Sequence, residues 1–312
     1  MPNFKIDGVV PIIPTPFTSE GSLDIPALGS LLDFAVRSGV CAVCLPAYAS
    51  EFYKLSDDER RELPLAAVQH LKGRLPVIAQ VNHVAAARVR EIASELERAG
   101  VSAISIAVPR LFGIPEADLL RYFGTILSAL SVPVVIQDFN PGGPTVSLEF
   151  TKALHRQHPN FAYLKLEEPL MAARVRSILE GASGEVGVLD GWGGMYLLEL
   201  IDAGIAGVMP ALGVSDLLHA VWTSARAGKK EEAFQIFHAI LPQIVYSLQN
   251  LEFFHHAEKS LLQQRGVLTH AFVRDATLSV HPVDRAHLDF LNCRIVELAR
   301  ELPERAASEI SS

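Results

Sequence analysis

The stretch Ala99-Gly100-Val101-Ser102-Ala103-Ile104 joins the end of a predicted helix to a predicted strand, and its pattern recurs twice along the chain. The other copies are Ser38-Gly39-Val40-Cys41-Ala42-Val43 and Ala203-Gly204-Ile205-Ala206-Gly207-Val208. Glycine closes a helix in the left-handed conformation, and the apolar run that follows is typical of a parallel strand covered on both faces. A helix that leads directly into a parallel strand indicates an α/β fold.

Applied to all 312 residues, the same pattern predicts eight strands separated by amphipathic helices. The strands are expected near 8–14, 40–47, 76–82, 103–109, 132–139, 161–167, 185–191 and 206–210. Two of the helices are expected at 56–71, where Ser56 and Glu59 form a capping box, and at 84–99. Eight alternating units predict a closed (β/α)8 TIM barrel, with an open doubly wound sheet as the alternative.

The strand signals end near residue 228, so the chain divides into a barrel at 1–228 and a C-terminal helical region at 229–312. One long or broken helix is expected over 229–264, with a kink at Pro242, and another over about 283–301. Because this region contains no strand, we expect it to pack on the barrel as part of one structural unit.

Composition limits the partners of this protein. The formal net charge is −8, and no run of Lys and Arg interleaved with aromatic residues is present, so we expect no nucleic-acid partner. No apolar stretch is long enough to span a membrane, and the first residues lack a basic segment followed by an apolar run. We therefore expect a cytoplasmic protein without a membrane partner. No His, Cys, Asp and Glu cluster has the spacing of a metal site, so we expect no metal.

The predicted sixth strand carries the chemistry. In Phe161-Ala162-Tyr163-Leu164-Lys165-Leu166-Glu167, strand alternation places Tyr163, Lys165 and Glu167 on the face that points into the barrel. Reactive groups of barrel enzymes lie at the carboxyl ends of the strands. A desolvated Lys165 amine adds to a ketone and forms an iminium, and Glu167 is then the candidate that moves protons. The alternative is a structural Lys–Glu pair that fills the neck of the barrel.

These segments resemble the dihydrodipicolinate synthase / N-acetylneuraminate lyase family over nearly the whole chain. The resemblance rests on the opening segment from Gly8 to Phe17, on the segment from Leu55 to Arg60 after Glu51, and on Tyr163-Leu164-Lys165. It implies a (β/α)8 barrel with a C-terminal helical region, a homo-oligomer that is usually a tetramer, and no cofactor beyond a covalent Schiff base through Lys165.

Several positions depart from the pattern of this family. Ala47-Tyr48-Ala49-Ser50-Glu51 replaces the usual Gly-Thr-Thr-Gly-Glu, and Gln137 replaces the acid/base tyrosine of the fifth strand. The tyrosine that a neighbouring subunit lends falls near Arg110-Leu111, and Pro141-Gly142-Gly143-Pro144 lacks the arginine that binds a second carboxylate. These departures argue against a lysine-biosynthesis synthase.

The same departures look like the branch of the family that contains 2-keto-3-deoxy-sugar-acid dehydratases. By that resemblance Lys165 is the nucleophile, Glu167 a general acid/base, and Gln137 orients a hydroxyl or a water. Ser50, the amides of the loop that contains Ala49, and Tyr48 are expected to hold the substrate carboxylate.

Three further residues complete the candidate site. Gly191 allows the backbone to approach a ligand, Met209 borders the pocket, and Arg110 is expected to pair with a distal anionic group of the substrate.

The expected function is Schiff-base dehydration or aldol cleavage of a 2-keto-3-deoxy sugar acid, so the enzyme is expected to be a lyase whose partner is a small 2-oxo acid. One alternative is pyruvate condensation of the dihydrodipicolinate synthase kind. The other is a catalytically silent barrel that binds a keto acid.

Overall fold

The computed structural model describes residues 4–110, 112–140, 143–169 and 171–310. Eight parallel strands form one sheet in the order β1-β8-β7-β6-β5-β4-β3-β2. Ile12, shortly after β1, forms bridges with Cys44 of β2 and with Ala211. The two ends of the strand order, β1 and β2, therefore meet and close the barrel. The strands are β1 Gly8–Val9, β2 Val43–Leu45, β3 Val77–Gln80, β4 Ala103–Ala107, β5 Val134–Asp138, β6 Phe161–Leu166, β7 Gly187–Asp190 and β8 Gly207–Val208.

All eight predicted strands are therefore present, and each is shorter than expected. The sequence pattern marks buried residues, and burial continues beyond the last regular ladder bond. In the first segment, for example, Pro11 cannot donate a hydrogen bond, yet Val10 and Ile12 still bond to the backbone of the eighth segment.

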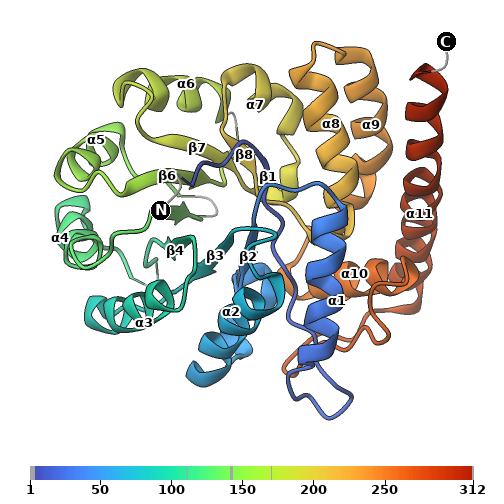
Figure 1. Ribbon diagram of the computed structural model, residues 1–312, viewed down its shortest axis with the longest axis horizontal. Helices are drawn as coiled ribbons and strands as arrows, with labels where there is room; N and C mark the ends of the chain where they lie inside the picture. Colours follow the sequence, from blue (N-terminus) through green and yellow to red (C-terminus); the bar gives the residue numbers. More distant parts are fainter. Residues whose placement is uncertain (1–3, 111, 141–142, 170, 311–312) are drawn as a thin grey trace.

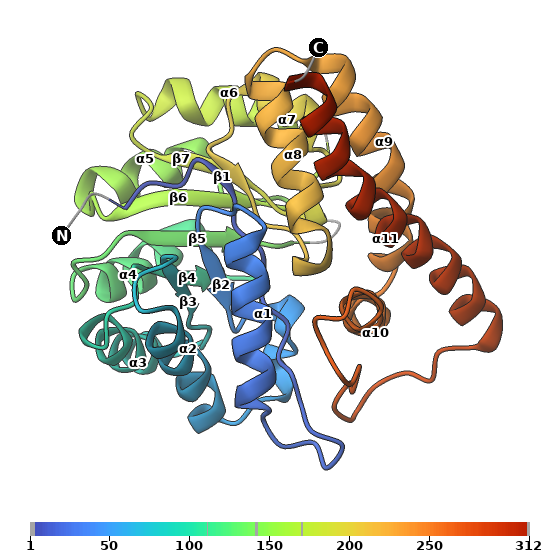
Figure 2. The same cartoon turned by 45° about the vertical axis from the view of Figure 1, so that its right-hand side comes forward.

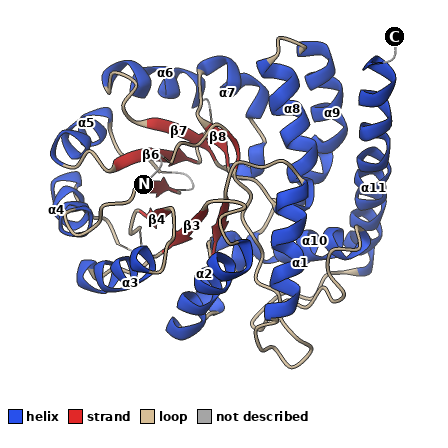
Figure 3. Ribbon diagram, in the orientation of Figure 1, coloured by secondary structure: helices blue, strands red, loops and turns tan. Residues whose placement is uncertain are grey.

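Helices α1 to α8 form the outer layer around the strands (Figures 1 and 3). They are α1 Ile25–Arg37, α2 Asp57–Leu71, α3 Ala86–Arg98, α4 Glu116–Leu127, α5 Leu148–Gln157, α6 Met171–Gly181, α7 Leu197–Ala203 and α8 Ser215–Arg226. The predicted capping box is confirmed, because Ser56 accepts from the amide of Glu59 and Glu59 accepts from the amide of Ser56. The α/β prediction and its barrel architecture are confirmed.

Two apolar layers separate the inside of the barrel from its outside. The outer layer, between strands and helices, contains Leu164 and Leu166, whereas Tyr163 belongs to the cluster inside the barrel. The alternation predicted for the sixth strand therefore holds from Tyr163 onward. At its start the pairing with β5 shifts by one residue, so Phe161 lies in the outer cluster and Ala162 packs against the inner one. The hydroxyl of Tyr163 accepts a hydrogen bond from the amide of Ile6 over 2.8 Å, which ties the start of the chain to the barrel interior.

The C-terminal region consists of α9 Lys230–Ser247, α10 Leu251–Gln264 and α11 Pro282–Ile310. The break in the predicted long helix falls at 248–250, where Asn250 caps α10, and α9 continues through Pro242. Proline removes one hydrogen bond of a helix, and the packing of α9 against α8 and α11 outweighs this loss. Figure 2 shows α10 lying across the end of the barrel, beside the chain that follows β2. Along the described residues, no helix is long and apolar enough to cross a membrane.

Candidate active site

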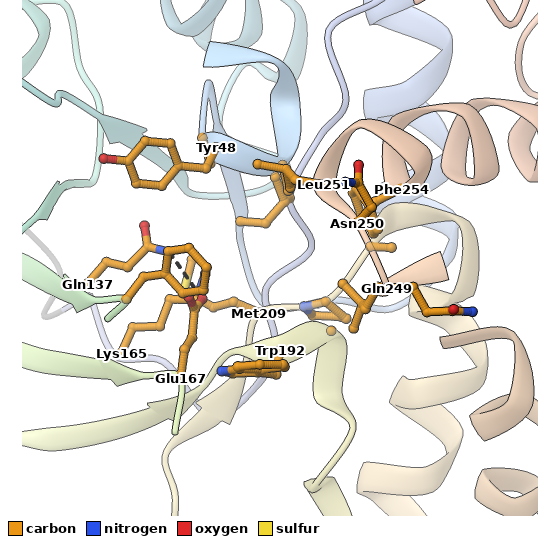
Figure 4. Close-up of a pocket in the computed structure, with 18 residues that line it drawn as sticks. Tyr48, Gln137, Lys165, Glu167, Trp192, Met209, Gln249, Asn250, Leu251 and Phe254 are labelled. Atoms are coloured by element: carbon orange, nitrogen blue, oxygen red, sulfur yellow. Dashed lines mark hydrogen bonds and ion pairs between the residues drawn. The ribbon is translucent and has the colours of Figure 1, made fainter. Parts of the chain in front are cut away.

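A cavity of about 320 Å³ opens at the carboxyl ends of the strands. Lys165 and Glu167 reach it from β6 and the residue that follows, and Gln137 reaches it from β5. Figure 4 shows these three side chains together, with Tyr48 on one side of the cavity and the start of α10 on another. Parallel strands bring their carboxyl ends to one face of the barrel, so residues far apart in the sequence meet here.

Lys165 and Glu167 form a buried ion pair. The Nζ atom of Lys165 lies 2.8 Å from Oε1 of Glu167, and the two side chains are 7% and 9% exposed. The amide of Gln137 donates to the same Oε1 atom over 3.1 Å. The amine and the carboxylate are thus close enough to exchange a proton directly, and Gln137 holds the carboxylate in place.

Asp190 and Gly191 lie directly behind this pair. A Cβ atom on Gly191 would lie 2.1 Å from Cγ of Glu167, so only glycine leaves room for the Glu167 side chain. Neither side-chain oxygen of Asp190 has a hydrogen-bond partner, and burial, followed by the charge of Glu167, raises the pKa of Asp190 well above its ordinary value. Burial and the charge of Glu167 thus both disfavour a second anion beside the Lys165–Glu167 pair.

The turn after β2 forms another wall of the cavity. Tyr48 and Ala49 line it, and burial, followed by the nearby charge of Glu167, raises the pKa of the Tyr48 phenol. Ser50 is fully buried; its hydroxyl donates to the carbonyl of Ile13 over 2.6 Å and accepts from the amide of Ala47 over 3.0 Å. The structure therefore places the Ser50 hydroxyl under the turn, where it supports the walls formed by its neighbours.

Arg110 does not line this cavity. Its guanidinium forms a bidentate contact with the buried carboxylate of Asp138, with distances of 2.7 and 2.9 Å from Nη2. Leu111, Pro141 and Gly142, which belong to the segments that depart from the family pattern, lie outside the described residues.

Most of the chain matches one protein family. Residues 5–290 match the model of the dihydrodipicolinate synthetase family. This chain belongs to that family. It is an enzyme of the lyase class, as the family resemblance predicts.

Two curated relatives of this dihydrodipicolinate synthetase family member illustrate the range of the family. The L-2-keto-3-deoxyarabonate dehydratase of Azospirillum brasilense is 30% identical over 286 residues, which cover 90% of this chain and 92% of that protein. The N-acetylneuraminate lyase of Rhizobium meliloti is 27% identical and covers 73% of this chain and 76% of its own.

The solved structures agree on the fold of the family. The 4-hydroxy-tetrahydrodipicolinate synthase of Methylacidiphilum fumariolicum SolV superimposes with a TM-score of 0.87 at 21% identity, over 96% of this chain and 99% of that one. The sialic acid aldolase of Ruminococcus gnavus gives 0.86 at 21% identity, over 95% and 99%.

In this family member one cavity is lined by six of the candidate residues, namely Tyr48, Ala49, Gln137, Lys165, Glu167 and Met209, whereas Ser50 and Arg110 do not line it. Gly191 lies against Glu167 rather than on the cavity surface.

Sequence reasoning missed two groups of residues. Gln80, at the end of β3, donates to Gln137 over 2.6 Å, and alternation along that strand would have placed it inside the barrel. The start of α10 supplies Asn250, Leu251 and Phe254 to the cavity, and no local signal indicates that a helix beyond the barrel reaches the site. Over the described residues, no group of three or more His, Cys, Asp or Glu side chains is arranged to hold a metal ion.

Proposed function

We propose that this lyase dehydrates a 2-keto-3-deoxy sugar acid through a Schiff base at Lys165. The observation that carries the proposal is the 2.8 Å contact between Nζ of Lys165 and Oε1 of Glu167 at the floor of the cavity. A ligand in this cavity meets a nucleophile, the buried amine, and a proton acceptor, the carboxylate beside it. The relative named L-2-keto-3-deoxyarabonate dehydratase supports the substrate class.

The first step forms the iminium. Glu167 takes a proton from the Lys165 ammonium, and the free amine adds to C2 of the keto acid. A second proton passes from the nitrogen to the C2 oxygen, which becomes a hydroxyl. Glu167 returns that proton to the C2 hydroxyl, which leaves as water, and an iminium joins Lys165 to C2. The positive iminium withdraws electrons and makes the C3–H bond acidic.

The second step eliminates the hydroxyl at C4. The Glu167 carboxylate removes a proton from C3, and the electrons of that bond move into the iminium to form an enamine. The enamine then expels the C4 hydroxyl, which takes the proton from Glu167 and leaves as water. Addition of water at C2 finally releases the dehydrated keto acid and restores the Lys165 amine. Gln137, bonded to Glu167 over 3.1 Å, keeps the carboxylate aligned through these transfers.

The cavity surface favours an acid with a single carboxylate. Among the described residues that line it, Lys165 and Glu167 are the ones with charged side chains. The backbone amides of Tyr48 and Ala49 are the candidates that hold the carboxylate, because the Ser50 amide donates to the carbonyl of Ala47 over 2.8 Å. The remaining surface suits a neutral, hydroxylated tail. Arg110 is paired with Asp138, so the described lining of the cavity offers no cation besides Lys165 for the second carboxylate that a condensation with aspartate semialdehyde requires.

The test combines trapping with product analysis. The protein is incubated with pyruvate and with five- and six-carbon 2-keto-3-deoxy acids, reduced with borohydride, and analysed by peptide mass spectrometry. We expect an adduct on Lys165 that Lys165→Met abolishes, and a product that has lost water without carbon–carbon cleavage. Pyruvate plus an aldehyde would indicate an aldolase. A folded protein without any adduct would contradict Schiff-base chemistry and leave a structural ion pair.

We further propose that the chain works in the cytoplasm as a homo-oligomer. Exposed apolar side chains on α11, Val283 at 69% and Phe290 at 61%, support contacts between copies. Size-exclusion chromatography with light scattering measures the mass of the assembly, and a monomer at micromolar concentration would contradict the proposal.

A further inference from the structure

Two walls of the substrate cavity come from segments about 200 residues apart. Tyr48 and Ala49 belong to the turn after β2, and Leu251 and Phe254 belong to the first turn of α10. Figure 4 shows both walls around the cavity above Lys165. The width of the cavity beyond Lys165 therefore depends on how α10 is attached to the β2 turn.

Glu51 connects the two walls from below. It follows the Tyr48–Ser50 turn directly, has no exposed surface, and adopts a left-handed backbone conformation with φ of 58°. Such a conformation is uncommon for a residue other than glycine and persists where the surroundings hold it. The Glu51 carboxylate accepts from Lys54 over 3.2 Å, from the amide of Arg274 over 3.0 Å, and from Lys259 of α10.

Lys259 is the partner on the helix. Its side chain is 1% exposed, it also donates to the carbonyl of Phe272 over 2.7 Å, and its ammonium lies 4.6 Å from the centre of the Phe17 ring. Burial lowers the pKa of Lys259 to about 8, against the opposing effect of Glu51. A second link runs from Lys54 to Glu252 over 2.7 Å.

A buried ion pair is an expensive way to join two segments, since apolar residues of the same volume are often at least as stable. Charged hydrogen bonds have defined directions and lengths, which apolar contacts lack. Neither Glu51 nor Lys259 lines the cavity, so their charged groups do not contact the ligand.

We propose that the Glu51–Lys259 ion pair sets the separation between the β2 turn and α10, and that Lys259 is thereby a positioning residue for the tail of the substrate. The inference rests on the proposed function, in that the cavity holds a 2-keto-3-deoxy acid bound to Lys165. Through this pair, Leu251 and Phe254 are held at the distance that selects the length of the tail.

The attachment is asymmetric, which makes it testable. Without Lys259, Glu51 keeps Lys54 and the amide of Arg274, so the β2 turn stays in place. The first turns of α10 keep the contacts of Glu252 with Lys54 and Tyr53 and of His255 with Tyr53, which come from the chain beyond the Tyr48–Ser50 turn, but they lose the buried link to Glu51. The keto-acid end of the site is thus unaffected, whereas the wall at the tail loosens.

The test compares Lys259→Met with Arg265→Met. Arg265 directly follows α10 as its C-cap and also forms an ion pair, with Asp216 at 2.5 Å, but at the end of the helix remote from the cavity. We expect Lys259→Met to trap pyruvate on Lys165 as the parent protein does. Its KM for the preferred 2-keto-3-deoxy acid should rise about tenfold with kcat within about threefold, and its preference between five- and six-carbon acids should narrow. Lys259→Arg should restore part of the preference.

Arg265→Met should leave both KM and the preference unchanged. An unchanged KM and preference in folded Lys259→Met, or an equal change in both variants, would overturn the inference. If Lys259→Met does not fold, Glu51→Gln/Lys259→Gln, which leaves no charge unpaired, carries the same expectation and the same refutation. Absence of any adduct in the parent protein would instead refute the proposed function.

Discussion

Gln80 donates a hydrogen bond from Nε2 to Oε1 of Gln137 over 2.6 Å, and this contact determines which end of the Gln137 amide faces Glu167. With its oxygen occupied by Gln80, Gln137 presents its Nε2 atom to Glu167, over 3.1 Å. Three side chains from β3, β5 and the end of β6 thus form one line of hydrogen bonds that ends at the proposed acid/base. All three side chains are buried.

This line predicts graded effects on turnover. Gln137→Leu should lower kcat by about ten- to a hundredfold because it removes a charge-assisted hydrogen bond from Glu167, and Gln80→Leu by about three- to tenfold because it only frees the amide to rotate. Steady-state kinetics of both variants and of the double variant measure the coupling. The effects should not add in free energy, since both act through the same contact, and simple additivity would refute the line.

Glu167→Gln separates covalent binding from proton transfer. The amide has the shape of the carboxylate and fits beside Gly191, but it cannot accept the C3 proton. We expect turnover to fall by about 10²- to 10⁴-fold while pyruvate is still trapped on Lys165 after longer incubation. Glu168→Gln, at the next residue, is the control and should keep turnover within a few-fold. Normal turnover by Glu167→Gln would assign the acid/base role to another group.

Arg110→Leu should reduce stability and leave substrate binding intact. The variant strands the buried carboxylate of Asp138, whose side chain has no exposed surface, and should cost about 3 kcal/mol in the free energy of unfolding. Denaturant titration measures this loss. Arg121→Leu, which breaks an exposed pair with Asp118 on α4, should change stability by less than about 1 kcal/mol. A large rise of KM in folded Arg110→Leu would restore the substrate-binding role that the sequence suggested.

Glu258 predicts a specific dependence of stability on pH. Burial raises the pKa of this carboxyl from 4.5 to about 7, against the opposing hydrogen bond from the amide of Gly213. Between these values the folded form binds more protons than the unfolded form, so the folded state loses stability as the pH rises from 4.5 to about 7.

Glu258→Gln removes this titration and keeps an oxygen for the Gly213 amide. The free energy of unfolding of the variant, relative to the parent, should therefore rise by about 3 kcal/mol between pH 4 and pH 8. Glu149→Gln, at a side chain that is 79% exposed, is the control and should show no such change. A parallel pH dependence in parent and Glu258→Gln would show that the buried carboxyl does not titrate in this range.

The barrel and the nucleophile were predictable because both depend on local repeats. Glycine followed by an apolar run marks three of the helix-to-strand junctions, and alternation along β6 places Lys165 inside the barrel with Glu167 one pleat further. The amino-acid sequence by itself thus determined the fold class, the capped start of α2, and the inward direction of Lys165 and Glu167 at the end of the sixth strand. These features follow from backbone geometry, which acts between residues a few positions apart.

Only the tertiary structure decided which hydrogen-bond partners the Ser50 hydroxyl and the Arg110 guanidinium have. Each is a polar group that must find a partner when it is buried, and the partners, Ile13 and Asp138, lie 37 and 28 positions away along the chain. The attachment of α10 to the barrel likewise includes the contact between Glu51 and Lys259, which lie 208 positions apart. Contacts at such separations form only after the barrel has closed, so no local pattern records them.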